Sequence, residues 1–119
     1  MKPERRIAHR LLDILDAIED MRSALAGMEY DAFSSHRIVR PAVERYFEII
    51  SEASRHLPET LKEKNAMISW RKIADLGNVL RHAYHDTDPA ILWEIYTVHL
   101  DPLEAAIRAA QADYPDVGA

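Results

Sequence analysis

Apolar residues recur along most of the chain at alternating spacings of four and three, the spacing of one face of an α-helix. This pattern predicts four major helices, over residues 4–26, 35–57, 70–85 and 89–112. The apolar face of the first consists of Ile7, Leu11, Ile14, Ile18, Met21, Leu25 and Met28. Pro3 suits the first turn of that helix, and Gly27 stands where a left-handed residue would end it.

The second apolar face consists of Val39, Val43, Tyr46, Ile50, Ala53 and Leu57. Pro41 removes a backbone donor there, so we expect either a kink at this position or a helix that begins at it. A turn is predicted over residues 28–33. Residues 58–65 read as a short polar helix that ends at Asn65, and Ser69 is a candidate N-cap for the next helix.

The third major helix carries Ile73, Leu76, Leu80 and Tyr84 on its apolar face. Asp88-Pro89 is a strong start signal for the fourth, in which Pro102 should disturb the preceding turn. We therefore predict one all-α domain over residues 1–119, an up-and-down bundle of four major helices plus one short helix. The tail, 113–119, is expected to be frayed.

Composition excludes several classes of site. The chain has no cysteine, so a disulfide, a thiolate zinc site and a cysteine nucleophile are all excluded. Its net charge of −5 argues against coating nucleic acid by charge alone, although a local cationic cleft stays open. The N-terminus mixes charged and apolar residues, and no run reaches membrane-spanning length, so we expect a cytoplasmic protein that does not contact a membrane.

The third major helix carries an unusual polar stripe. Asp75, Asn78, His82 and His85 are three, four and three residues apart, and Arg81 and Tyr84 flank them. A surface helix usually displays Lys and Glu, whereas Asn and His offer richer hydrogen-bond chemistry, which favours a site. The alternative is that the histidines only occupy the negative end of the helix dipole. The residues alone leave both open.

A metal site is disfavoured. His82 and His85 lie one turn apart near a carboxylate, but no HExxH pattern is present and no third ligand is evident. The other histidines, His9, His36, His56 and His99, are scattered with no partner at metal or triad spacing. Trp70 and Trp93 fit core anchors better than base-stacking platforms.

The run Gly77 to Tyr84, preceded by WRKIA at 70–74 and followed by ILWEIYTVHLDPL, resembles the HEPN domain of the HepT-like toxin family. The resemblance covers about residues 4–112 and implies a HEPN-like bundle. The family motif is Arg, any four residues, His, any one residue, Tyr. His82 and Tyr84 match it, and Asn78 stands where members often have Asn. The Arg position, however, is Gly77.

The resemblance implies a metal-independent endoribonuclease without a cofactor, in which His82 is the general acid or base and Asn78 assists. It also implies a homodimer with two facing copies of His82. The motif Arg would stabilise charge on the phosphate. Arg81, donated by either subunit, is a candidate substitute. Gly77→Arg should raise cleavage if this is the missing interaction, unless Gly77 faces a neighbouring helix.

The family gives Tyr84 a second use. Resemblance implies a minimal nucleotidyltransferase antitoxin that transfers AMP to the motif tyrosine and thereby silences the toxin. This use does not need an Arg at position 77. Two hypotheses therefore stand: a ribonuclease toxin with an RNA substrate, and a catalytically weakened helical partner that docks a nucleotidyltransferase and presents Tyr84.

Overall fold

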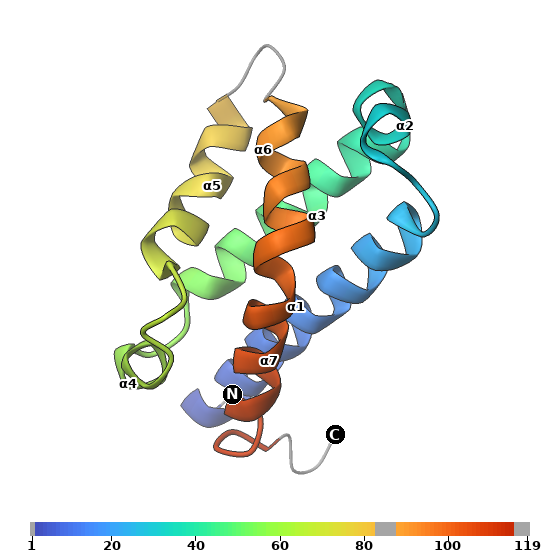
Figure 1. Cartoon of the computed structure of the whole chain (residues 1–119). Coiled ribbons are helices and arrows are strands. Elements are labelled where there is room, and N and C mark those ends of the chain that lie inside the picture. The colour runs from blue at the N-terminus through green and yellow to red at the C-terminus, as the bar shows by residue number, and fades with distance from the viewer. Residues whose placement is uncertain (1, 83–87, 116–119) are drawn as a thin grey trace.

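The computed structural model describes residues 2–82 and 88–115, and every regular element in these two ranges is helical. The elements in chain order are α1 (Pro3–Leu25), α2 (Tyr30–Ser35), α3 (Val39–Arg55), α4 (Glu59–Lys64), α5 (Trp70–His82), α6 (Pro89–Glu94), the π-helical turn η1 (Ile95–His99) and α7 (Leu100–Ala110). Figure 1 shows α6, η1 and α7 joined into one long rod. The predicted all-α bundle is confirmed.

The core lies where α1, α3 and the α6–α7 rod meet. α1 packs against α3 and α7, and α3 packs on its other side against α5 (Figure 1). The side chains that are almost wholly buried at this junction include Leu11, Ile14, Ile18, Met21, Val43, Phe47, Leu92, Leu100 and Ile107. Each side chain of this size contributes about 1.5–3 kcal/mol when it leaves water, so these apolar faces hold the bundle together.

Four predicted helix boundaries that carry a chemical signal are confirmed. α1 begins at Pro3, and Gly27 beyond its end has a φ of 77°, which favours glycine. The carboxylate of Asp88 accepts a 2.9 Å hydrogen bond from the Ala90 amide at the start of α6. Asn65 directly follows α4, as expected.

The predicted turn over 28–33 is wrong, because residues 30–35 form α2. Phe33 is fully buried and stacks on Trp93, with ring centroids 5.4 Å apart. A six-residue helix shows too little periodicity to stand out in a sequence, and it is held by this tertiary contact.

Pro41 and Pro102 both lie within helices without ending them. α3 begins at Val39, so Pro41 falls in the first turn, where the amide has no intrahelical acceptor. Nδ1 of His36 accepts hydrogen bonds from the Ile38 and Val39 amides at 3.2 and 3.0 Å and so caps this start. The disturbance expected before Pro102 takes the form of the π-helical turn η1.

α5 is the least enclosed of the long helices. Gly77 is the one fully buried residue among its thirteen, while Ile73, Leu76 and Leu80 are half-buried against α3. Val79 is 54% exposed. α5 is therefore an edge helix. No helix in the described ranges is long and apolar enough to cross a membrane.

Candidate functional site on helix α5

The polar stripe predicted on this helix is an exposed face. Asp75, Asn78 and His82 are all exposed on α5, and Arg81 is exposed beside them. Trp70 anchors the start of the helix, since its indole N–H donates to the carbonyl of Asn65 at 3.1 Å. The three predicted catalytic residues therefore all lie exposed on the last turns of one helix.

Two residues of the predicted site lie outside the described residues. Tyr84 is the expected acceptor of AMP, and His85 is the last member of the stripe. The predicted extension of the helix from 82 to 85 falls in the same gap.

Gly77, at the motif Arg position, is buried where α5 crosses α3. A Cβ on Gly77 would lie 2.5 Å from Oγ and 2.9 Å from Cβ of Ser51. Such contacts cannot be tolerated without moving a backbone. Gly77 therefore faces a neighbouring helix, which is the case in which Gly77→Arg is not expected to raise cleavage, because the new side chain would clash with α3.

The helix crossing is fixed by hydrogen bonds that the sequence analysis did not find. Oγ of Ser51 accepts from the Gly77 amide at 3.0 Å and donates to the Ala74 carbonyl at 2.9 Å. The guanidinium of Arg55 donates to the same carbonyl from Nε and Nη2, at 3.3 and 2.8 Å. Ser51 is a small polar residue among apolar neighbours in α3, and this was the available signal.

Arg81 lies back over Gly77. Its Nη1 is 3.5 Å from the position that a Gly77 Cβ would take, since helical side chains lean toward the N-terminus and residues four apart share a face. His82, the next residue, points about 100° further around the helix. The missing side chain at 77 thus leaves room for a guanidinium that starts one turn later.

Arg81 also contributes to the electrostatics of α3. The pKa of Glu52 is lowered chiefly by a hydrogen bond from His56, with Nε2 and Oε1 3.1 Å apart, and further by the charges of His56, Arg55 and Arg81. Glu52 is therefore held as a carboxylate. The same hydrogen bond gives His56 a structural partner four residues earlier in the chain.

A hollow of about 320 Å³ opens beside Arg81, between α1, α3 and α5. Its charged lining residues are Arg10, Asp13, Arg45, Glu48, Glu52 and Arg81. Within the described ranges, no group of three or more carboxylate or imidazole side chains could hold a metal ion. The hollow is lined by residues of three helices, and Arg81, which flanks the polar stripe, is its lining residue from α5.

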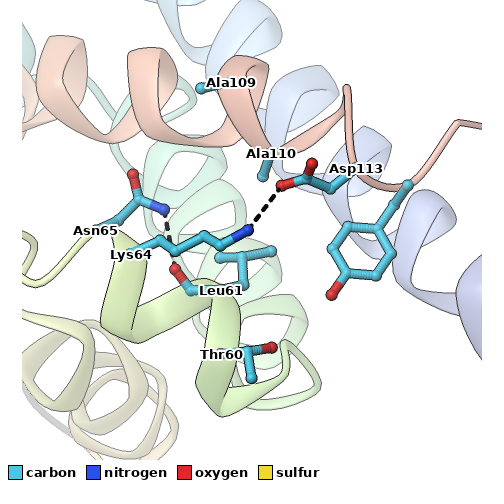
Figure 2. A pocket seen from close by; sticks show the side chains of 8 residues that line it. Thr60, Leu61, Lys64, Asn65, Ala109, Ala110 and Asp113 are labelled. Atoms are coloured by element: carbon cyan, nitrogen blue, oxygen red, sulfur yellow. Dashed lines mark hydrogen bonds and ion pairs between the residues drawn. The ribbon is translucent and has the colours of Figure 1, made fainter.

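A second hollow, of about 470 Å³, lies between α4 and the end of α7 (Figure 2). Lys64 crosses it, with Nζ 3.5 Å from Oδ2 of Asp113, while Asn65 donates to the Leu61 carbonyl at 2.9 Å. Its two charged groups neutralise each other, and none of the predicted site residues lines it. This opening is unrelated to the chemistry on α5.

The comparisons with known proteins agree with the family resemblance. The family model described as ribonuclease HepT-like matches residues 14–110, which include α3, α5 and the whole α6–α7 rod. The chain belongs to the HepT-like family. The matched range includes Asn78, Arg81 and His82.

Several curated proteins are similar to this HepT-like chain. "Putative RNase MJ1380" of Methanocaldococcus jannaschii is 34% identical over 92 residues, 77% of this chain and 84% of that protein. "Probable ribonuclease HepT" of Thermococcus cleftensis is 34% identical over 84 residues, 71% of this chain and 76% of that protein. "Putative RNase TTE0752" of Caldanaerobacter subterraneus is 28% identical over 95 residues, with 80% and 85% covered. No solved structure matches the chain significantly.

Proposed function

We propose that this HepT-like protein is a metal-independent endoribonuclease, the toxin of a toxin–antitoxin pair. His82 is its general acid or base, Asn78 helps to orient the RNA, and Arg81 binds the scissile phosphate. The observation that carries the proposal is the position of Arg81. Its guanidinium lies 3.5 Å from the Cβ position of Gly77, so the exposed Arg81 supplies a cation beside the motif position, which cannot itself carry one.

Metal-independent RNA cleavage requires only an imidazole, a proton donor and a guanidinium. The RNA 2′-hydroxyl loses its proton to an imidazole, O2′ attacks the adjacent phosphorus, and the bond from phosphorus to the 5′-oxygen breaks. A second proton donor protonates the leaving oxygen. Products are a 2′,3′-cyclic phosphate and a 5′-hydroxyl. A guanidinium on the phosphate oxygens stabilises the negative charge that develops there.

A homodimer would supply both proton-transfer groups. α5 is an edge helix that packs on α3 and leaves Val79 54% exposed, so it has a face open to a second copy. Two α5 helices facing each other across a two-fold axis would place two His82 and two Arg81 side chains around one cleft. Because adjacent positions diverge by about 100°, Arg81 of one subunit would serve His82 of the other.

The second candidate function concerns Tyr84. In this alternative the protein is a weakened enzyme that binds a minimal nucleotidyltransferase antitoxin and receives AMP on Tyr84. The buried Gly77 favours it, because the motif Arg cannot be accommodated at that position. An AMP group near His82 would block RNA entry by volume and by charge repulsion. Both functions would operate in the cytoplasm, where the RNA and the antitoxin are met.

The test is cleavage of a mixed RNA pool by purified wild-type protein, with His82→Ala as the inactive variant. Thr97→Ala is a suitable control, since Thr97 is exposed on η1 and its hydroxyl bonds only to its own helix. We expect wild type and Thr97→Ala to cleave alike and His82→Ala to approach background. Absence of cleavage by the wild type, together with AMP transfer to Tyr84 by a minimal nucleotidyltransferase, would leave the alternative standing instead.

A further inference from the structure

The hollow beside α5 brings charged side chains from three helices onto one surface. Arg10 and Asp13 come from α1, Arg45 and Glu48 from α3, and Arg81 from the end of α5. The three helical segments are far apart in the sequence, and no spacing motif connects them. Because Arg81 lines the hollow and flanks the polar stripe, the hollow adjoins the candidate site.

The charges of this hollow are not evenly satisfied. Glu48 pairs with Arg45 at 3.3 Å, and Glu52 is hydrogen-bonded to His56 at 3.1 Å, so both carboxylates already have a partner. Among the side chains of residues 2–82 and 88–115, by contrast, neither Arg10 nor Arg81 has an ion pair or a side-chain hydrogen bond. Two guanidinium groups therefore remain able to bind an anion.

We propose that this hollow binds the nucleotide of the RNA strand next to the scissile bond, with Arg81 on the scissile phosphate and Arg10 on the next phosphate of the backbone. The inference rests on the proposed function and extends the RNA path from α5 across α3 to α1. Planar guanidinium groups bind phosphate oxygens in a bidentate manner, and they are less strongly hydrated than ammonium groups.

The size and the carboxylates of the hollow fit a nucleotide better than a bare phosphate. A volume of about 320 Å³ is far larger than a phosphate group needs. Carboxylate oxygens accept hydrogen bonds from amino groups on base edges and from ribose hydroxyls. Asp13, exposed on α1, offers such an acceptor beside Arg10.

The experiment measures binding of a fluorescently labelled single-stranded RNA by anisotropy, at several salt concentrations. His82→Ala serves as the background, so that the RNA stays intact. Into it we introduce Arg10→Ala, Arg10→Lys, and the control Arg37→Ala, whose side chain is exposed in the α2–α3 connection and outside the hollow. Thermal unfolding of each variant checks that it is folded.

Arg10→Ala should bind the RNA roughly tenfold more weakly, as expected for loss of one charge-assisted contact. The slope of log affinity against log salt should become shallower by about 0.7, the value for one phosphate contact on a single strand. Arg10→Lys should keep most of the affinity and slope, because it keeps the charge, and Arg37→Ala should match the background protein.

Unchanged affinity and slope in folded Arg10→Ala, alongside RNA cleavage by the wild type, would overturn this subsite and leave the nuclease proposal intact. RNA that fails to bind the His82→Ala background at all would overturn both. AMP is added as a competitor to separate a strand site from a mononucleotide site. If AMP displaces the RNA at comparable concentration and its binding also depends on Arg10, the hollow binds free nucleotides and the proposed RNA path is wrong.

Discussion

Replacing Gly77 by alanine should lower the free energy of unfolding, although alanine is the better helix former. The substitution adds one methyl group at the point where α5 crosses α3. Its Cβ would lie 2.5 Å from the Ser51 hydroxyl oxygen and 2.9 Å from the Ser51 Cβ. Rotation of Ser51 could move the oxygen but not its Cβ, so the two helices must separate.

The magnitude follows from three contributions. Alanine gains about 1 kcal/mol over glycine in a helix interior. Overpacking a tight contact costs typically about 1–3 kcal/mol. The Ser51 hydroxyl, which bonds to the Gly77 amide at 3.0 Å and to the Ala74 carbonyl at 2.9 Å, would lose about 1 kcal/mol of hydrogen bonding. The net destabilisation is therefore about 1–3 kcal/mol, which lowers Tm by roughly 4–12 °C in a domain of this size.

Urea unfolding followed by far-UV circular dichroism measures this change, with Asn78→Ala as the matched control at the next, exposed position of α5. The control gains helix propensity without a clash and should be neutral or slightly more stable. In the double variant Ser51→Gly/Gly77→Ala the clash disappears, so it should lose at least about 1 kcal/mol less than the sum of the single variants. Gly77→Ala at wild-type stability, or additive single effects, would refute the packing argument.

The remaining predictions address the proposed site and one cap. His82→Ala should lower RNA cleavage by about 10²–10⁴-fold, while Tyr84→Phe keeps cleavage but cannot accept AMP, as mass spectrometry after incubation with the nucleotidyltransferase would check. Arg81→Ala should lower kcat more than Arg81→Lys does; equal loss would show that charge is not its contribution. Val79→Glu should give monomers in sedimentation and lose cleavage, and a dimer that persists would place the interface elsewhere. Asp88→Ala should cost about 1 kcal/mol of stability in thermal unfolding through loss of the Ala90 cap, and an unchanged Tm would contradict this.

The helices could be predicted because their physical signals are local. An apolar face repeats every three or four residues, and Pro3, Gly27 and Asp88 mark boundaries through their own backbone or hydrogen-bond chemistry. The sequence of α2 shows neither a clear apolar repeat nor a clear boundary residue. It forms because Phe33 is buried against Trp93, a contact between segments sixty residues apart that periodicity cannot reveal.

For the candidate site, the sequence could predict the arrangement of residues within α5 but not the contacts of α5 with other helices. The spacing of Asn78 and His82 fixes a shared face, and the structure has that face exposed. The partner of Gly77 could not be predicted, because a buried glycine at a helix crossing is defined by what the other helix presents, here Ser51. For the same reason, the sequence alone could not predict that Arg10 and Arg81 line the same hollow, because their proximity depends on how α1 and α5 pack.

Analysis of the RNA product ends is the measurement that tests the central claim most directly. Purified wild-type protein is incubated with a short RNA in excess chelator, and the products are examined by mass spectrometry beside those of His82→Ala. The proposed mechanism predicts a 2′,3′-cyclic phosphate and a 5′-hydroxyl, formed without divalent metal and lost in His82→Ala. Cleavage that requires metal, leaves a 5′-phosphate, or survives in His82→Ala would contradict it.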